Sequence, residues 1–262
     1  MFKFCSLYSG STGNSSLIQT ENTKILIDAG ESAKKISQAL NSINVEPTEI
    51  NAILITHEHS DHIKGVGTFS KKYNIPVYAN SETWNAMPTQ KEKVTSDNIK
   101  YFKFEKFNIG DLSILPFSIP HDAANPCGFN IYYKDKKISV ATDIGHMTTE
   151  VVNNLTNSSF ILLEANYDPN ILKCSSYPYQ LKQRIAGPNG HLPNDIAGKT
   201  ISYLVQHGLN TVMLGHLSKE NNFPELAYKT VVEQLIENNV NEDLFNLSVA
   251  DRYNVSPIID VS

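Results

Sequence analysis

The sequence predicts a single α/β domain, a four-layer αββα sandwich that spans residues 1–262. β-Prone runs alternate with helical segments in two comparable halves, as expected for two sheets that are each covered by helices. Two of the predicted strands, at 51–56 and 159–166, are almost continuously apolar, so both of their faces should be buried. No repeat, low-complexity tract or linker divides the chain.

The first half is dominated by short strands separated by turn-rich segments. A helix is expected directly after the third strand, because Ile36, Ala39, Leu40 and Ile43 recur at a helical period. Ser81 is the expected N-cap of a later helix. The expected elements are strands 2–8, 16–20 and 24–30, a helix at 31–43, strand 51–56, a helix after residue 62, strand 76–79 and a helix at 81–87.

The second half returns to strands and then becomes more helical. The expected elements are strands 101–107, 112–120, 128–135 and 136–143, a helix at 148–155, strand 159–166, helices near 178–186, 194–207 and 223–238, strand 211–215 between the last two helices, and strand 244–250. Strands with intervening helices in both halves lead to the two covered sheets of the predicted sandwich.

Composition restricts the class of protein. A net charge of −5 and a pI near 5.9 argue against a broad basic face that coats nucleic acid. They do not exclude a nuclease, because bound divalent ions add local positive charge. The cysteines Cys5, Cys127 and Cys174 are far apart and form no CxxC pair, which predicts free thiols in a reducing cytoplasm. The start of the chain is too polar for a signal peptide, and no apolar run reaches the length of a transmembrane helix. We therefore expect a cytoplasmic protein without membrane association.

The stretch "THEHSDHIKG" at 56–65 concentrates metal-binding residue types at the end of a buried strand. His57 and His59 are two residues apart in an extended segment and should point the same way. Asp61 and His62 follow where a helix begins. Imidazole and carboxylate groups suit zinc, manganese or iron. Four such residues exceed what one open catalytic ion takes from one segment, so two ions about 3.5–4 Å apart are expected.

This H-x-H-x-D-H pattern resembles the signature of the metallo-β-lactamase superfamily, whose fold is the αββα sandwich. The resemblance implies further ligands that each follow a strand, and the sequence offers His121 in "SIPHDAAN", Asp143 in "ISVATDIGH" and His216 in "TVMLGHLS". By this resemblance, one ion would be held by His57, His59 and His121. The other would be held by Asp61, His62 and His216, with Asp143 between the two ions.

Two more residues are assigned by the resemblance. Asp28 in "ILIDAG" corresponds to a residue that supports the active-site loop from behind the ligands. His191 in "NGHLPND" looks like the histidine that contacts the scissile phosphate or protonates the leaving oxygen in nucleic-acid-processing members. A cap contact at a helix start is the alternative for His191. We favour the catalytic role, because phosphodiester cleavage needs a proton donor near neutral pH.

Four segments narrow the branch of the superfamily. "FCSLYSGSTGNSSLI", "LLEANYD", "GHLPND" and "LGHLSKENNFPELA" look like the YycJ/WalJ-like subfamily of bacteria, whose members are considered cytoplasmic DNA exonucleases. The interval between Asp143 and His216 is too short for the β-CASP domain that RNase J-type nucleases carry there. The loops of the core must therefore hold the substrate.

Substrate contacts are less clearly marked. The loop "YSGSTGNSS" at 8–16 is either a phosphate-binding nest of N–H groups or an ordinary hairpin turn. We expect contacts from Ser9, Ser11, Arg184 and Ser218. Lys64, Tyr177, Tyr179, Lys182 and Lys219 are further candidates, although each also fits a solvated charge or a core aromatic.

The function expected from the sequence is hydrolysis of phosphodiesters, most specifically those of DNA, by a site with two zinc or manganese ions. The ions would generate hydroxide from a bridging water near neutral pH, and Asp61 would orient it besides being a ligand. His191 would steady the phosphate or the leaving oxygen. Two alternatives are a hydrolase of a small phosphodiester, thioester or lactone, and a non-catalytic metal-bearing partner in a repair or signalling complex.

Overall fold

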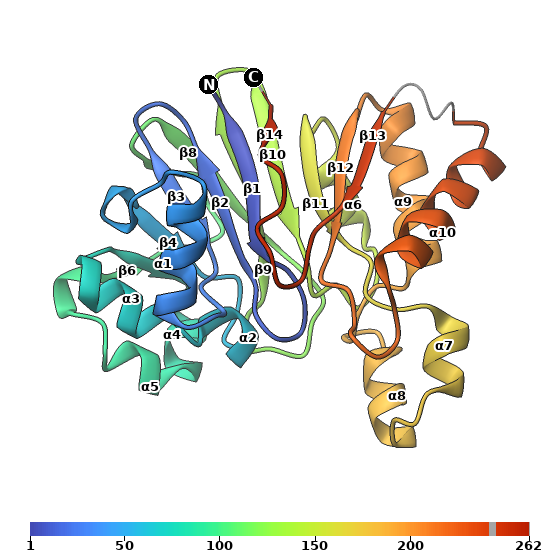
Figure 1. Cartoon of the computed structure of the whole chain (residues 1–262), viewed down its shortest axis with the longest axis horizontal. Coiled ribbons are helices and arrows are strands. Elements are labelled where there is room, and N and C mark those ends of the chain that lie inside the picture. Colours follow the sequence, from blue (N-terminus) through green and yellow to red (C-terminus); the bar gives the residue numbers. More distant parts are fainter. Residues whose placement is uncertain (241–244, 262) are drawn as a thin grey trace.

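Two seven-stranded sheets pack face to face in the computed structural model, which describes residues 1–240 and 245–261. Helices cover the outer face of each sheet, so helix, sheet, sheet and helix layers follow one another across the molecule (Figure 1). The predicted αββα architecture in a single α/β domain is confirmed.

The first sheet contains the N-terminal strands. It combines an antiparallel part, β1 to β3, with a parallel part, β3 to β6. Its strands, in spatial order, are β14 (Ile259–Asp260), β1 (Lys3–Tyr8), β2 (Ser15–Gln19), β3 (Lys24–Ile27), β4 (Ala52–Leu54), β5 (Val77–Ala79) and β6 (Ile99–Tyr101). The helical segments of this half are α1 (Ala33–Ser42), η1 (Pro47–Glu49), α2 (Ser60–Ile63), α3 (Val66–Tyr73), α4 (Ser81–Ala86), α5 (Pro88–Lys91) and η2 (Ser96–Asn98).

The second sheet contains the later strands. Its order is β13 (Asn246–Val249), β12 (Thr211–Gly215), β11 (Phe160–Glu164), β10 (Lys136–Ala141), β9 (Cys127–Tyr133), β8 (Leu112–Ser118) and β7 (Phe107–Ile109). Strands β10 to β13 are parallel. The helices of this half are α6 (Thr149–Leu155), α7 (Pro169–Cys174), α8 (Tyr179–Ile185), α9 (Asn194–Gln206) and α10 (Pro224–Glu237).

Apolar side chains form three core layers, one at each interface between neighbouring layers of the four-layer sandwich. The central layer lies between the sheets and joins Phe4 and Ile27 of the first sheet to Phe129 and Phe160 of the second. The other two layers lie between each sheet and its helices. Strand β11 is buried along its whole length, and its sequence is accordingly apolar on both faces up to the final Glu164.

Two predicted elements are corrected. The N-cap of α4 is Asn80, not Ser81, because the Asn80 side chain accepts the N–H of Thr83 at 2.9 Å. The predicted strand 101–107 is divided between two sheets, since β6 ends at Tyr101 and β7 begins at Phe107. The segment between them crosses from one sheet to the other, and its Phe102 packs in the central core beside Phe107 of β7. The rings of Phe102 and Phe107 stack with centroids 5.8 Å apart.

The remaining differences concern short elements. Sequence analysis did not predict α5, α7 or β14, each of which has six residues or fewer and therefore too few positions to show a period. Of the predicted strand 244–250, residue 244 lies outside the described residues, and β13 covers Asn246–Val249. The other predicted elements are found with small shifts at their ends.

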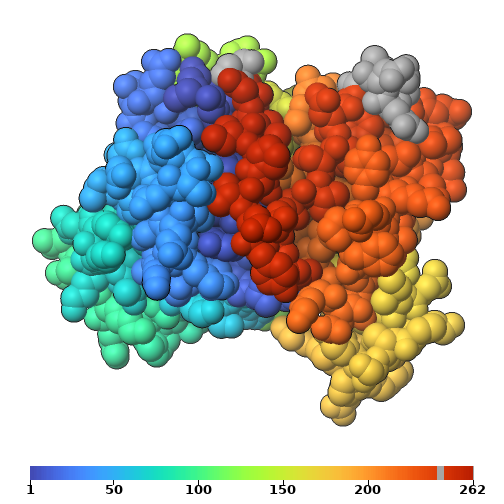
Figure 2. All heavy atoms as spheres, viewed as in Figure 1, coloured from blue at the N-terminus to red at the C-terminus, as the bar shows by residue number. Residues whose placement is uncertain are grey.

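The C-terminal segment connects the two sheets. It leaves β13 in the second sheet and ends as β14, which pairs with β1 of the first sheet. Figure 2 shows this segment, in red, crossing between the blue and orange halves. Within the described part of the chain, every helix is too short or too polar to cross a membrane.

Lys137 ties the second sheet to α6. Its buried ammonium donates to the carbonyl oxygens of Asn154 at 2.8 Å and Thr156 at 2.5 Å, at the end of that helix. Burial lowers the pKa of Lys137 to about 8. The Asn154 carbonyl also accepts a hydrogen bond from Asn130 Nδ2 at 3.0 Å, so the lysine and this amide together satisfy carbonyls at the end of the helix.

We expect Lys137→Met to lower the free energy of unfolding by about 1–3 kcal/mol, because two buried carbonyls lose a charged donor. Urea unfolding of the purified variant measures this change. Lys136→Met is the matched control, since the Lys136 side chain is more exposed and makes no hydrogen bond or ion pair within the described residues. Equal stability of the two variants would show that Lys137 has no such role.

Candidate metal centre

The candidate ligands come from strand ends that meet at one edge of the two sheets. In the first sheet, β3 and β4 are parallel, and Asp28 and His57 lie just beyond their carboxyl ends. In the second sheet, β8, β10 and β12 point the same way and are followed by His121, Asp143 and His216. Ligand sites of open α/β sheets lie at the carboxyl ends of strands.

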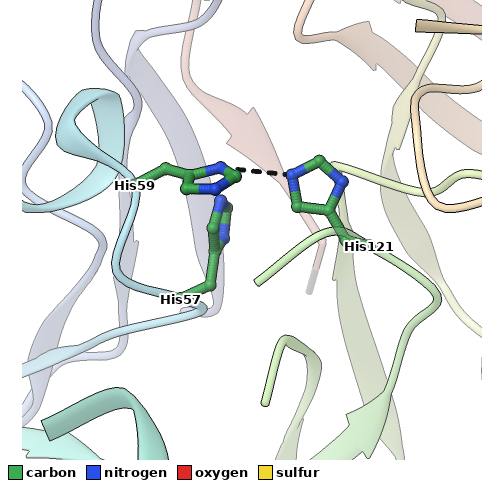
Figure 3. Close-up of side chains that lie close together, drawn as sticks. All are labelled: His57, His59 and His121. Atoms are coloured by element: carbon green, nitrogen blue, oxygen red, sulfur yellow. Dashed lines mark hydrogen bonds between the residues drawn. The ribbon is translucent and has the colours of Figure 1, made fainter. Parts of the chain in front are cut away.

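The first group of donors consists of three histidines. His57, His59 and His121 offer ring nitrogens that all lie within 4.8 Å of one another. His59 Nδ1 lies 3.3 Å from His121 Nε2, and Figure 3 shows the three rings converging. His57 and His121 are buried, whereas His59 is half-buried. The group therefore opens to solvent on the His59 side.

The second group adds a carboxylate to two histidines. Asp61, His62 and His216 also place donor atoms within 4.8 Å of one another. Asp61 Oδ2 lies 3.6 Å from His62 Nε2 and 3.5 Å from His216 Nε2. The Asp61 side chain is 22% exposed while both rings are buried, so the carboxylate forms the outer wall of this group.

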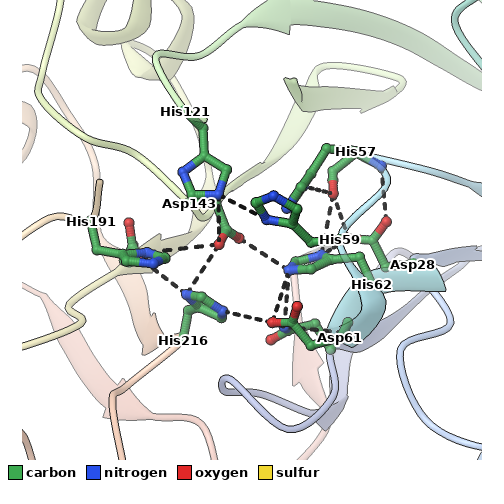
Figure 4. Close-up of polar contacts among 12 residues, drawn as sticks. Asp28, His57, His59, Asp61, His62, His121, Asp143, His191 and His216 are labelled. Carbon is green, nitrogen blue, oxygen red and sulfur yellow. Dashed lines mark hydrogen bonds and ion pairs between the residues drawn. The ribbon is translucent and has the colours of Figure 1, made fainter. Parts of the chain in front are cut away.

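Asp143 lies between the two groups. Its Oδ2 is 3.2 Å from His62 Nε2, and its Oδ1 is 3.7 Å from His121 Nε2 and 3.5 Å from His216 Nδ1 (Figure 4). One carboxylate therefore faces histidines of both groups. The structure brings together all seven residues that the sequence nominated as ligands.

Four of the histidines make a hydrogen bond from Nδ1, the ring nitrogen on the side away from the cluster, to an oxygen atom. His62 Nδ1 donates to Asp28 at 2.7 Å and His216 Nδ1 donates to Glu164 at 2.8 Å. The other two contacts are His121 Nδ1 with the Gly190 carbonyl at 3.0 Å and His57 Nδ1 with the Thr56 hydroxyl at 3.0 Å. Because Nδ1 carries the proton in each contact, Nε2 is left with its lone pair directed into the cluster.

The charges and unpaired atoms of the cluster fit divalent cations. His57 Nε2 and Asp143 Oδ2 are buried and have no hydrogen-bond partner, as expected for atoms reserved for an ion. Among the described residues, no lysine or arginine bonds to the carboxylates of Asp28, Asp61, Asp143 or Glu164. Buried carboxylates that have no lysine or arginine beside them need another positive charge, and a bound cation supplies it. Nitrogen and carboxylate donors in these numbers suit zinc or manganese.

Backbone strain is concentrated at three of these positions. Asp28, Asp143 and His216 have φ angles of 61°, 60° and 54°, in the left-handed region that residues with a side chain seldom adopt. Each is the residue at which the chain turns sharply away from its strand. Such conformations cost of order 1–3 kcal/mol each and occur at functional sites, where the surrounding contacts enforce them.

Asp28, which was expected to support the active-site loop, contacts both that loop and one ring of the cluster. Its Oδ1 accepts the Thr56 N–H at 2.9 Å, and its Oδ2 accepts the Thr56 hydroxyl at 2.8 Å as well as His62 Nδ1. Burial raises the pKa of Asp28, although His62 and Thr56 oppose that shift. A single carboxylate therefore fixes both the start of the histidine-rich loop and one of its rings.

Glu164 is a site residue that sequence analysis missed. Its side chain is fully buried and accepts four hydrogen bonds, from His191 Nδ1, His216 Nδ1 and the N–H groups of Ile144 and Leu192. Burial opposes its ionisation, but His191 and His216 outweigh burial and lower the pKa of Glu164. A sequence signal was present, because an acidic residue ends the otherwise apolar strand "FILLE".

His191 lies at the rim of the cluster and faces it. Its Nδ1 donates to Glu164 at 2.8 Å, and its ring centroid is 5.2 Å from that of His121 and 5.3 Å from that of His216. Its side chain remains 19% exposed. Burial disfavours protonation, yet the charge and hydrogen bond of Glu164 raise the pKa of His191 above its ordinary value. His191 is therefore not a helix cap, since α9 has Pro193 at its N-cap.

The predicted substrate contacts fall into two kinds. Ser9 and Ser218 are buried: the Ser9 hydroxyl accepts the His216 N–H at 2.8 Å, and the Ser218 hydroxyl accepts the Asn221 N–H at 3.2 Å. Ser11 is exposed in the β1–β2 turn. Arg184 is also exposed and pairs through Nε with Asp122, next to His121. Ser11 and Arg184 are the two that a substrate could reach.

The loop between β1 and β2 is a hairpin turn that supports the cluster. Gly13 donates to the Gly10 carbonyl at 3.0 Å, and the Gly10 N–H is bonded to the Asn14 side chain at 2.9 Å. Asn14 Nδ2 in turn lies 3.1 Å from His62 Nε2 and 3.3 Å from Asp61 Oδ2. At least two of the loop's N–H groups are thus used within the turn.

Comparisons with known proteins agree with this geometry. Residues 8–185 match the model of the metallo-beta-lactamase superfamily. The chain belongs to that superfamily. It is 42% identical over 239 residues to Exodeoxyribonuclease WalJ of Streptococcus pneumoniae serotype 2 (strain D39 / NCTC 7466), covering 90% of this chain and 89% of that protein. It is 34% identical over 235 residues to Exodeoxyribonuclease YycJ of Bacillus anthracis, covering 89% of each. The resemblance to the YycJ/WalJ-like branch is confirmed.

Solved structures of other members of the superfamily share the fold. The metallo-beta-lactamase fold protein YhfI from Bacillus subtilis superposes with a TM-score of 0.72 at 16% identity, over 97% of this chain and 98% of that one. Human tRNase Z, short form, superposes with a TM-score of 0.68 at 15% identity, over 99% of each chain. At such low identity these likenesses concern the fold alone.

Because the seven candidate ligands form a cluster suited to divalent ions, adding Zn²⁺ or Mn²⁺ to the metal-free protein should raise its free energy of unfolding. A ligand that binds only the folded state adds about 2.7 kcal/mol when its concentration is 100 times its Kd. Thermal unfolding with metal, and again after chelation, measures the effect. Folded Asp143→Ala protein should show a much smaller rise. An unchanged melting temperature in the unsubstituted protein would contradict the assignment.

Asp28→Asn should lower metal affinity by about 10–100-fold, because His62 loses the carboxylate that orients its ring. Asparagine also tolerates the left-handed backbone at this position, so the loop itself should persist. Competition with a chromogenic chelator measures the affinity. Asp111→Asn is the control, since Asp111 bonds Thr20 and Asn22, away from the cluster. Equal affinities in both variants would remove Asp28 from the support of the site.

Proposed function

We propose that the protein is a metal-dependent nuclease that cleaves DNA, acting as an exonuclease. The observation that carries this proposal is the position of His191, held by Glu164 at 2.8 Å and facing a cluster whose two donor groups share Asp143. A ring in that position can donate a proton beside a phosphate bound at the cluster. The names of the WalJ and YycJ relatives support DNA as the substrate.

The proposed ligand sets follow the two donor groups. His57, His59 and His121 would hold one divalent ion, and Asp61, His62 and His216 the other, with Asp143 facing both. Zinc and manganese are the proposed metals, because imidazole and carboxylate donors suit both. When bound, such ions neutralise charge on a phosphate and make water a stronger nucleophile near neutral pH.

The protein's own groups account for orientation and proton transfer. Because Nδ1 of His191 donates to Glu164, its Nε2 is available to hold or protonate the leaving oxygen. The Glu164 carboxylate at Nδ1 stabilises the protonated ring that this step requires. Asp61, a proposed ligand at the exposed wall of the cluster, is also proposed to accept a hydrogen bond from the attacking water and so orient it.

The proposed roles of the substrate contacts follow their exposure. Arg184 lies beside Asp122 and His121 and would place a positive charge next to the backbone of the nucleic acid. Ser11, at the tip of the β1–β2 turn, would offer a hydroxyl to a phosphate oxygen. Ser9 and Ser218, being buried, would act by positioning the loop that carries His216.

The test is degradation of an end-labelled DNA duplex by purified protein with added Mn²⁺. We expect release of label that requires metal and falls about 10²–10⁴-fold in His191→Ala, the usual contribution of general acid catalysis. Asp143→Ala should abolish it. His207→Ala is the control, because His207 caps the end of α9 and is outside the cluster. Full activity in folded His191→Ala protein would overturn the role of His191, and no cleavage of DNA by metal-loaded protein would overturn the proposed function.

A further inference from the structure

Helices α7 and α8 form an arm beside the metal centre. Figure 1 shows them projecting from the second half of the molecule, and the same segment protrudes, in yellow, at the lower right of Figure 2. α7 buries only Leu172, and α8 buries none of its residues. Two helices that bury so little apolar surface contribute little to the core, so their side chains are available for another role.

The arm encloses a pocket of its own. The pocket has a volume of about 440 Å³, within the usual range for sites that bind small molecules or single groups. Tyr179, one of the lining residues, is 75% exposed, so its ring is accessible from solvent. Its main walls are Tyr167, Leu172, Lys173, Tyr177, Tyr179 and Lys182. We call this the arm pocket.

The charge of the arm differs from that of the whole chain. Residues 168–190 carry three basic side chains, Lys173, Lys182 and Arg184, and one acidic side chain, Asp168, whereas the chain as a whole has a net charge of −5. Asp168 is occupied in capping α7. Lys182 donates to the carbonyls of Lys173 and Ser175, while the Lys173 ammonium has no hydrogen bond or ion pair to a described residue. Aromatic rings beside lysines are the combination that binds single-stranded nucleic acid.

Two contacts and one short stretch of chain connect the arm to the metal centre. Arg184 of α8 pairs with Asp122, whose Oδ1 is 3.4 Å from His121 Nε2. The carbonyl of Ile185 accepts the N–H of His191 at 2.9 Å. Tyr167, on the pocket wall, follows Glu164 by three residues. The arm pocket and the cluster are therefore neighbouring parts of one surface.

Helix α8 extends from the metal centre to the arm pocket. Arg184, near its end, pairs with Asp122 beside His121, whereas Tyr179, its first residue, lines the arm pocket. The two residues are about 7.5 Å apart along the helix axis. A nucleic-acid strand with a phosphate at the cluster could therefore continue past α8 to the arm pocket.

We propose that the arm pocket binds a nucleobase of the substrate strand, stacked on Tyr179 and Tyr177, with Lys173 next to the adjoining phosphate. This inference rests on the proposed nuclease function and adds to it a recognition site for unpaired nucleotides. Stacking needs an unpaired base, so the site selects single-stranded or frayed ends, and it tolerates any sequence because every base has an aromatic face.

The test measures binding and cleavage separately. Binding uses metal-loaded protein and a short single-stranded DNA with phosphorothioate linkages, which resist hydrolysis. We expect Tyr179→Ala to weaken binding by about 5- to 150-fold, the range for loss of one stacked base, and to raise KM for cleavable single-stranded DNA similarly. Tyr179→Phe, which keeps the ring, should bind like the unsubstituted protein. Tyr228→Ala, which removes an exposed tyrosine from α10, should have no effect.

A matched DNA identifies the interaction as stacking. An oligonucleotide with abasic sites at the terminal nucleotides should bind the unsubstituted protein as weakly as normal DNA binds Tyr179→Ala. Tyr179→Ala protein should bind the normal and the abasic oligonucleotide with the same affinity. Hydrolysis of a small chromogenic phosphodiester should be unchanged in Tyr179→Ala, because such a substrate does not reach the arm.

The outcomes separate the two proposals. If the protein cleaves DNA but Tyr179→Ala and the abasic DNA bind normally, the arm pocket is not a base site and the nuclease function stands. If binding depends on Tyr179 and on the base but metal-loaded protein cleaves no DNA, the arm pocket stands and the proposed function fails. If the unsubstituted protein does not bind single-stranded DNA, the base site is overturned.

Discussion

The rest of the site depends on Asp143, a buried carboxylate that faces histidines of both donor groups. A buried charge of this kind is costly unless opposite charge is placed around it. Here no lysine or arginine among the described residues contacts it, and one of its oxygens has no hydrogen-bond partner. The arrangement of two sheets, whose strand ends converge at one edge, makes this concentration of donors possible.

The second requirement is rigidity behind the donors. Asp28 and Glu164 are buried carboxylates that each hold a histidine of the second group through Nδ1, one from each sheet. Glu164 also holds His191, so one side chain links a candidate ligand to the candidate proton donor. Because these carboxylates also accept backbone N–H groups of neighbouring loops, the orientation of the rings follows from the position of the strands.

The molecule divides chemistry and recognition between its core and its arm. The cluster lies on strand ends, where packing on both sides leaves little freedom of movement. The arm buries few of its residues and presents tyrosines and lysines to solvent. Ordinary strands and helices occupy the interval between Asp143 and His216. Within that interval, the two short helices of the arm provide the surface next to the site.

The sequence by itself determined the αββα class, the order of nearly all the elements and the four residues of the H-x-H-x-D-H pattern, because apolar runs and close spacing are local patterns. His121, Asp143 and His216 were nominated through the resemblance to the superfamily, since each follows a different strand. Only the tertiary structure placed Glu164 beneath both His191 and His216, since these residues come from separate segments and no local pattern links them. It alone divided 101–107 between two sheets, because an aromatic-rich crossing and a strand have the same local composition. It also showed that Ser9 and Ser218 are buried supports, which depends on long-range packing rather than on residue type.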